Sequence, residues 1–180
     1  ASDPMGVPTS LGMHSLFLAG ALLSPLSDRI IVNSQIGRTF YASNGYCAER
    51  LTVIPNGIDT KSFAILPEQR ARVRQEWGVT DCEVLIGRAA RLDPRKDYPS
   101  FLKAAGRVSR VTPAARFVCI GDDTDCVALR AIAAAEGIAD RVIWAGGRAD
   151  MPAVYHALDI CVSSSVTEGF PNAVAESNER

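Results

Sequence analysis

The cysteine patterns of a zinc site or a disulfide framework are missing from this sequence. Its 180 residues include five cysteines, an odd number, and no Cys-x-x-Cys pair. Cys119 and Cys161 lie within apolar, strand-like runs, where an unpaired cysteine behaves as a small hydrophobic side chain. Neither His14 nor His156 lies near a cysteine pair, so we expect no zinc site. The pattern predicts a reduced, cytoplasmic protein.

An excess of charge and a long hydrophobic run are also missing. The formal net charge is -1, which predicts no general attraction to nucleic acid or to an anionic membrane. Any phosphate must therefore be bound by locally placed Arg and Lys. The apolar stretch 11–23 is too short to span a bilayer, and no basic segment precedes it as in a signal peptide. We interpret it as an amphipathic helix, capped by Ser10 and packed on a sheet.

Two common catalytic signatures are absent as well. The sequence contains no Gly-x-Gly-x-x-Gly and no Gly-x-Ser-x-Gly, which weakens a nicotinamide, flavin or hydrolase function. Asp123-Thr124-Asp125 has the spacing of a metal site, but it follows Gly121 at a strand-to-helix turn, where Asp suits a helix cap. We therefore expect no bound metal. The composition, 47% hydrophobic and 22% charged, is that of a globular protein with one sizeable core.

Short apolar strands alternate with helical segments along most of the chain. This order is typical of an α/β protein with a doubly wound, Rossmann-like parallel sheet, whose ligands bind beyond the carboxyl ends of the strands. Pro55-Asn56-Gly57 interrupts the order as a turn or hinge. The expected strands are 28–34, 51–54, 84–89, 116–120, 141–145 and 160–163, and the expected helices are 10–23, 34–42, 68–77, 98–111, 125–136, 151–157 and one from 172 onward.

Arg91 and Lys96 form the first candidate site. They stand five residues apart across the turn Arg-Leu-Asp-Pro-Arg-Lys, directly after an expected strand. Arg offers a planar fork to phosphate oxygens and Lys a point charge. Cations aimed at a departing diphosphate stabilise the transition state more than the ground state. The alternative is a solvated basic loop.

The stretch from Glu168 to Glu176 forms the second candidate site. Carboxylates accept hydrogen bonds from sugar hydroxyls, Gly169 allows close backbone approach, and the N–H groups that open a helix can meet an anion. Asn172 is the natural cap of that helix. The alternative is a capped helix with acidic residues on its surface.

Together these motifs resemble the donor half of the group 1 (GT4-type) retaining glycosyltransferases of GT-B fold. The resemblance runs from about residue 27 to Glu176, and includes Val-Ile-Pro-Asn-Gly-Ile-Asp at 53–59. It implies transfer of a sugar from a donor such as a UDP-sugar or GDP-sugar, with retention and without a cofactor or metal. It implies catalytic roles for Arg91, Lys96 and Glu168. The implied donor-binding residues are Arg91, Lys96, Arg148, Met151, Glu168, Gly169, Phe170, Pro171, Asn172 and Glu176.

The resemblance also implies a division of the chain. Residues 1–59 would end an N-terminal domain that holds a glycan or lipid-linked acceptor, and residues 60–180 would be a truncated donor domain. The family's run of small residues after the second Glu is replaced by Ser177-Asn178-Glu179-Arg180, so we expect a piece of a longer protein that is inactive alone. That protein would be cytoplasmic, with room for peripheral contact at the inner face of the membrane.

A second departure from the family and two alternative functions remain. Asp123 stands where the family often has a second Gly, so the turn after Gly121 is expected to differ in shape. A non-catalytic module that binds nucleotide sugars is one alternative. A sugar-nucleotide epimerase of GT-B architecture is the other, although the Gly-Phe-Pro-Asn interior at 169–172 favours transfer.

Overall fold

The computed structural model describes residues 11–57, 67–168 and 171–178, and within them the chain forms two compact units. Residues 11–57 group with 167 and 168 in one unit, and residues 67–166 with 171–178 in the other. Ser10, the expected cap of the first helix, and most of the segment 59–67 lie outside the described residues.

The N-terminal unit contains a two-stranded parallel sheet. Strand β1 (Ile30–Val32) pairs with β2 (Leu51–Val53), and helix α2 (Gln35–Ser43) connects them. Ser34 caps α2, since its Oγ accepts a hydrogen bond of 3.0 Å from the N–H of Gly37. Short 3₁₀ turns at Ser24–Leu26 and Ala48–Arg50 precede the two strands.

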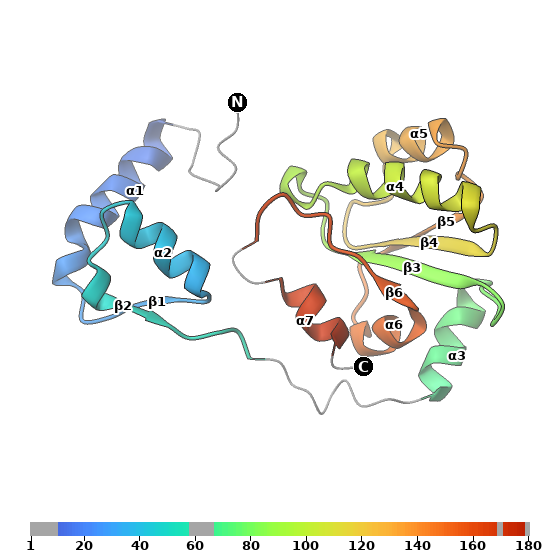
Figure 1. The fold of residues 1–180 in the computed structure, drawn as a ribbon, viewed down its shortest axis with the longest axis horizontal. Coiled ribbons are helices and arrows are strands. Elements are labelled where there is room, and N and C mark those ends of the chain that lie inside the picture. The colour runs from blue at the N-terminus through green and yellow to red at the C-terminus, as the bar shows by residue number, and fades with distance from the viewer. Residues whose placement is uncertain (1–10, 58–66, 169–170, 179–180) are drawn as a thin grey trace. The chain divides into compact units, whose positions relative to one another are not determined.

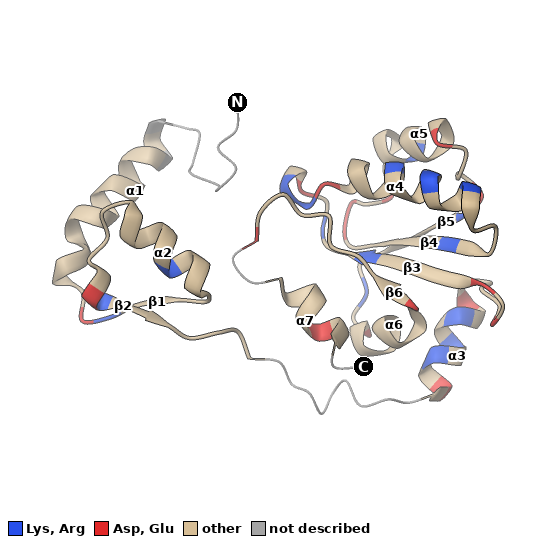
Figure 2. Cartoon of the chain, in the orientation of Figure 1, with Lys and Arg blue, Asp and Glu red and all other residues tan. Residues whose placement is uncertain are grey.

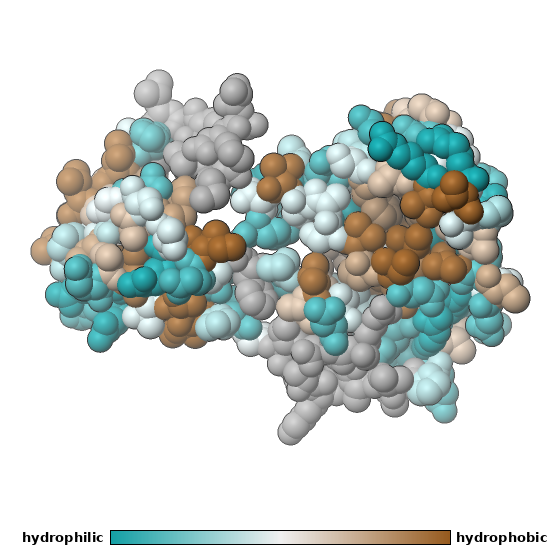
Figure 3. Space-filling view, in the orientation of Figure 1, coloured by the Kyte–Doolittle hydropathy of each residue, from teal (hydrophilic) through white to brown (hydrophobic). Residues whose placement is uncertain are grey.

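Helix α1 (Leu11–Leu23) differs from the amphipathic helix that was expected on a sheet. It contacts an aromatic cluster instead: the ring of Phe17 lies 5.3 Å from Tyr46 and 5.9 Å from Tyr41, centroid to centroid. Leu16 and Leu22 are exposed, and Figure 3 shows hydrophobic side chains at the surface of α1. The helix is apolar on several sides, so only one strip of it is buried within the described unit.

The C-terminal unit is built on a four-stranded parallel sheet in the order β5-β4-β3-β6. Helices α4 and α5 cover one face, and α3 and α6 the other, with α7 beside α6 (Figure 1). This arrangement confirms the predicted doubly wound sheet. The strands are β3 (Val84–Ala89), β4 (Ala115–Ile120), β5 (Val142–Gly146) and β6 (Ile160–Cys161), and the helices are α3 (Pro67–Glu76), α4 (Tyr98–Val111), α5 (Val127–Ala135), α6 (Met151–Ala157) and α7 (Asn172–Asn178).

Strand β3 lies inside the sheet and is buried on both faces. Ile86 belongs to the core under α4 and α5, and Leu85 to the core under α3 and α6. Gly87 faces the same side as Leu85, and a Cβ at this position would overlap the side chain of Leu158. The absence of a side chain at Gly87 therefore lets the chain before β6 pack against the strand.

Strand β6 is two residues long, although the sequence predicted 160–163. The N–H of Val162 still bonds to the carbonyl of Gly87, at 2.8 Å. Beyond it, Ser164 turns to the loop after β3, where its hydroxyl donates to the carbonyl of Asp97 at 2.8 Å. The ladder ends early because the chain turns to that loop at Ser164.

Asp159 joins three elements at the amino edge of the sheet. Its carboxylate accepts hydrogen bonds from the N–H of Leu85 at 2.7 Å, from Arg70 at 2.7 Å and from Arg74 at 3.0 Å. The Arg74 side chain is only 3% exposed and also donates to the carbonyls of Thr80 and Glu83. Partial burial acts to raise the pKa of Asp159, but these hydrogen bonds outweigh it and hold the pKa below its usual value.

We expect Asp159→Asn to lower the free energy of unfolding by about 2–4 kcal/mol, because it leaves the buried charge of Arg74 without its carboxylate. Urea or thermal unfolding measures this effect. Asp125→Asn is the matched control, because Asp125 pairs with Arg130 on the open surface, where ion pairs contribute little. An equal loss in both variants would contradict the structural role of Asp159.

The ion pair of Asp159 with Arg74 also predicts that stability depends on pH. Because the folded-state pKa of Asp159 lies below the unfolded value of about 4, its stabilisation is present above that pH and is lost as pH falls through the folded pKa. The stability difference between the wild type and Asp159→Asn should therefore shrink as the pH falls below about 4. A difference that stays constant or grows in acid would show that the carboxylate charge is not what stabilises the fold.

Candidate functional site

Polar loops follow the carboxyl ends of the four parallel strands, and Tyr98 joins two of these ends. The buried Tyr98 hydroxyl lies 2.9 Å from the carbonyl of Ile120, which ends β4, and accepts a bond of 3.2 Å from the N–H of Ala90, which follows β3. Burial raises the pKa of Tyr98, so the hydroxyl keeps its proton and can donate. The two loops therefore start from a fixed edge.

The loop from β3 to α4 carries Arg91 and Lys96, and Figure 2 shows basic and acidic positions side by side in it. A 3₁₀ turn, Pro94–Lys96, forms its centre. Asp93 accepts the Arg95 N–H at 2.9 Å and the Arg95 guanidinium at 3.0 and 2.9 Å. These bonds hold the pKa of Asp93 well below its usual range. Arg95 is thus paired with a carboxylate of its own loop.

Arg91 stands differently in the same loop. Its side chain is 72% exposed and forms a long ion pair with Asp93, at 3.9 Å. A guanidinium held this loosely can turn to a ligand at little cost. Lys96 is half-buried. The two predicted cations therefore lie in one loop.

The chain after β6 fastens this loop from the other side. Ser164 Oγ donates to the carbonyls of Asp97 at 2.8 Å and Lys96 at 3.2 Å, and the N–H of Val166 bonds to the carbonyl of Arg95 at 2.9 Å. Arg88, buried in β3, donates to the Lys96 carbonyl as well. Sequence analysis assigned no role to Arg88, although a charge within an otherwise apolar strand was the signal for one.

The loop after β4 approaches its neighbours closely. Gly121 has φ 139°, and a Cβ there would overlap the backbone of Ala90. Asp123 has φ 61°, in the left-handed region that glycine favours and that Asp tolerates better than most residues. Asp123 thus adopts a backbone conformation typical of glycine, and a turn shaped differently from the family's stays a prediction. Thr124, fully buried, bonds through Oγ1 to the carbonyl of Gly121 at 2.8 Å.

Arg148 follows β5 and links two helices of the same unit. Its guanidinium bonds to Glu76 at the end of α3 and to Asp150 at the start of α6, at 2.5 to 3.1 Å. It also lies 5.8 Å from the ring centroid of Trp77. The hydrogen bond from Arg148 lowers the pKa of Asp150 to about 2. Met151 begins α6 and packs half-buried against the adjoining core.

Helix α7 carries Glu176. Its Oε2 accepts a 3.0 Å hydrogen bond from the hydroxyl of Tyr155, which is buried in α6. The helix begins at Asn172, and the carbonyl of Pro171 accepts from Val174 and Ala175, so Asn172 is the first helical residue instead of the cap. The tyrosine therefore fixes the orientation of the Glu176 carboxylate.

Glu168, Gly169 and Phe170 complete the set of predicted donor-binding residues. Glu168 is half-buried and groups with the N-terminal unit, whereas Gly169 and Phe170 lie outside the described residues. Within residues 11–57, 67–168 and 171–178, no cluster of three or more His, Cys, Asp or Glu is arranged to hold a metal ion. No helix in the same ranges is long and apolar enough to cross a membrane.

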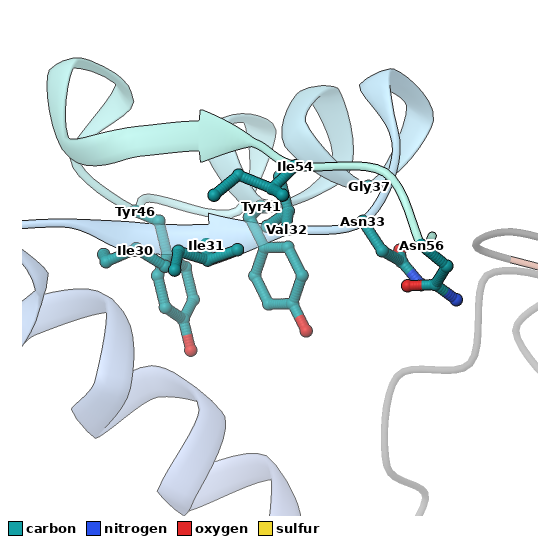
Figure 4. Close-up of a pocket in the computed structure, with 9 residues that line it drawn as sticks. All are labelled: Ile30, Ile31, Val32, Asn33, Gly37, Tyr41, Tyr46, Ile54 and Asn56. Atoms are coloured by element: carbon teal, nitrogen blue, oxygen red, sulfur yellow. The ribbon is translucent and has the colours of Figure 1, made fainter. Parts of the chain in front are cut away.

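A separate pocket of about 550 Å³ lies in the N-terminal unit (Figure 4). Apolar side chains of β1 and the rings of Tyr41 and Tyr46 line it, while Asn33 and Asn56 stand where the two strands end. None of the residues predicted from the sequence to bind a donor is among the nine drawn. The nine are Ile30, Ile31, Val32, Asn33, Gly37, Tyr41, Tyr46, Ile54 and Asn56.

Comparison with known sequences identifies similar enzymes. The GDP-mannose-dependent alpha-(1-6)-phosphatidylinositol monomannoside mannosyltransferase of Mycolicibacterium smegmatis is 28% identical over 145 residues, which cover 79% of this chain and 38% of that enzyme. The UDP-Gal:alpha-D-GlcNAc-diphosphoundecaprenol alpha-1,3-galactosyltransferase of Escherichia coli is 28% identical over 130 residues, covering 71% and 34%. The chain thus spans less than half the length of these relatives.

Solved structures and a family profile agree with this likeness. The crystal structure of Anabaena HepE in complex with UDP and glucose has a TM-score of 0.80 at 25% identity, covering 91% of this chain and 45% of HepE. A glycosyltransferase from Rickettsia africae has a TM-score of 0.78 at 15% identity, covering 97% and 46%. These neighbours confirm the predicted GT-B architecture. The family described as "Glycosyl transferases group 1" matches residues 83–179, more than half of the chain, and the protein therefore belongs to the group 1 glycosyl transferases.

Proposed function

We propose that this chain is the donor-binding part of a retaining glycosyltransferase, and that it binds a nucleotide-diphosphate sugar at the carboxyl edge of the C-terminal sheet. The observation that carries the proposal is the loop that presents Arg91 and Lys96. Its backbone is bonded to the chain after β6 through Ser164 and Val166, while Arg91 remains largely exposed. A cationic loop with a fixed backbone suits a doubly charged ligand.

The two cations would act on the leaving group. Transfer breaks the bond between the anomeric carbon and a phosphate oxygen, and negative charge grows on the departing diphosphate. Arg91 and Lys96 would stabilise that charge more strongly in the transition state than in the ground state. The reaction then needs no cofactor and no metal, because the side chains supply the positive charge.

The other predicted residues would hold the rest of the donor. Glu168 and the segment Gly169, Phe170, Pro171 and Asn172 would meet the sugar and a phosphate. Glu176, held by Tyr155 at 3.0 Å, would accept hydrogen bonds from the ribose hydroxyls. Arg148 and Met151 would border the base. Arg148 already bonds to Glu76 and Asp150, so it would contribute its flat face or its backbone more readily than its N–H groups.

The names of similar proteins support a nucleotide-linked donor without settling the base. HepE was crystallised with UDP and glucose, whereas the mycobacterial relative depends on GDP-mannose by name. The acceptor would be a glycan or a lipid-linked molecule bound on the N-terminal side in the complete protein. Lipid-linked acceptors would bring that protein into peripheral contact with the cytoplasmic face of the membrane.

Arg91→Ala should weaken the binding of a nucleoside diphosphate about 10- to 100-fold, because it removes hydrogen bonds between charged groups. UDP, GDP and ADP are titrated while thermal stability is followed; a ligand at 100 times its Kd stabilises the protein by about 2.7 kcal/mol. Arg110→Ala is the matched control, since Arg110 lies in the last turn of α4, at the amino edge of the sheet, and is exposed. If no nucleotide binds, or if Arg91→Ala binds as the wild type does, the donor site is wrongly assigned.

Glu176→Gln should reduce affinity for the ribonucleotide about tenfold, because charged acceptors bind hydroxyls more strongly than neutral ones. It should change affinity for the 2′,3′-dideoxy analogue much less, since that ligand lacks the hydroxyls. Glu136→Gln, another half-buried Glu, at the end of α5, should leave both affinities unchanged. Equal losses for the two ligands in Glu176→Gln would count against a ribose contact.

The stereochemistry of the reaction is tested on the complete protein. With a matching donor and acceptor, the product should carry the transferred sugar in the anomeric configuration of the donor, as measured by the proton coupling constant in NMR. A product of the opposite configuration would rule out the retaining reaction while leaving donor binding intact.

A further inference from the structure

Arg88 is a charged side chain buried inside strand β3. It is 2% exposed and lies at the same side of the strand as Ile86, where its guanidinium carbon is 5.1 Å from the ring centroid of Tyr98. A guanidinium in this position costs free energy unless its N–H groups find acceptors. The hydrogen-bond partners of Arg88 therefore indicate the role of this buried charge.

The hydrogen bonds of Arg88 join two loops. Nη2 donates to the carbonyl of Lys96 and, at 3.1 Å, to the hydroxyl of Ser165, and Nη1 lies 3.4 Å from the carbonyl of Val162. Lys96 belongs to the loop after β3, and the other two residues follow β6. Since β3 and β6 are paired neighbours, one side chain connects the loops at the carboxyl ends of both strands.

Together with the bonds from Ser164 and Val166, these bonds hold the backbone of the cationic loop in place. The carbonyls of Arg95 and Asp97 are already held by Val166 and Ser164. The carbonyl between them, that of Lys96, is held by Ser164 at 3.2 Å and by Arg88. The Lys96 side chain therefore extends from a backbone that is bonded on both sides of it.

We propose that Arg88 is a positioning residue that sets the phosphate-binding geometry of the Arg91–Lys96 loop, an inference that rests on the proposed donor site. Arg88 does not touch the donor. It keeps the Lys96 backbone against Ser165, so that binding does not have to order the loop first. Groups preorganised in this way lose less entropy when the ligand binds.

The test compares each nucleoside diphosphate, UDP, GDP or ADP, with its own nucleoside. Arg88→Met keeps the length of the side chain but removes its donors, and should weaken binding of the diphosphate about tenfold, with unchanged affinity for the nucleoside. Arg88→Lys keeps the charge but has no planar fork to hold two partners at once, and should lie between Arg88→Met and the wild type. Isothermal titration, with competition for the weak nucleosides, measures the ratio of the two affinities.

Arg116→Met is the matched control. Arg116 lies on β4 of the same sheet, pairs with Glu83 at 3.2 Å, and is mostly buried. We expect this variant to lower stability while the ratio of diphosphate to nucleoside affinity stays as in the wild type. Hydrogen exchange gives a second measurement: the amide of Val166, bonded to Arg95, should lose protection in Arg88→Met and keep it in Arg116→Met.

The outcomes separate the two proposals. If the wild type binds no diphosphate, the donor site fails and the inference falls with it. If Arg91→Ala weakens diphosphate binding but Arg88→Met leaves the ratio and the Val166 exchange unchanged, only the positioning role is overturned. Equal losses for diphosphate and nucleoside in Arg88→Met would also overturn it, because they would indicate general destabilisation.

Discussion

The bonding of three successive carbonyls, at residues 95–97, is the constraint on which the candidate site depends. Ser164, Val166 and Arg88 supply the donors, and all three lie on the two neighbouring strands β3 and β6 or directly after β6. The loop carries three cations, Arg91, Arg95 and Lys96, and Arg95 is paired with Asp93. Here its backbone is fixed before any ligand arrives, and its exposed Arg91 faces outward.

The two edges of the sheet serve different purposes. At the amino edge, Asp159 collects Leu85, Arg70 and Arg74 into an ion-pair cluster that stabilises the unit. At the carboxyl edge, Asp93 pairs with Arg95 inside the loop after β3, Ser164 and Val166 hold the backbone of that loop, and Arg91 stays exposed. This division follows from parallel strands, because all carboxyl ends meet at one edge and all amino ends at the other.

Much of the fold could be predicted from local patterns. The bounds of β3, α4 and α6 agree with those expected from apolar periodicity, and the resemblance to the family is confirmed by residues 83–179. The contacts of the predicted site residues could be predicted less well. Arg91 and Lys96 share a loop, Glu176 meets Tyr155, and Arg148 binds Glu76 and Asp150. Neither Tyr155 nor Glu76 is a sequence neighbour of its partner, so no local pattern could identify these pairs.

The sequence by itself determined the class of fold, the family and which cations follow the first strand of the C-terminal unit, because periodicity, glycine positions and short motifs are local properties of the chain. The tertiary structure decided which groups hold the backbone carbonyls of the cationic loop, and that Arg88 is one of them. That information depends on hydrogen bonds between residues far apart in the sequence, such as Arg88 and Ser165, which are 77 positions apart. Such bonds exist only after the strands pair and their loops meet at one edge.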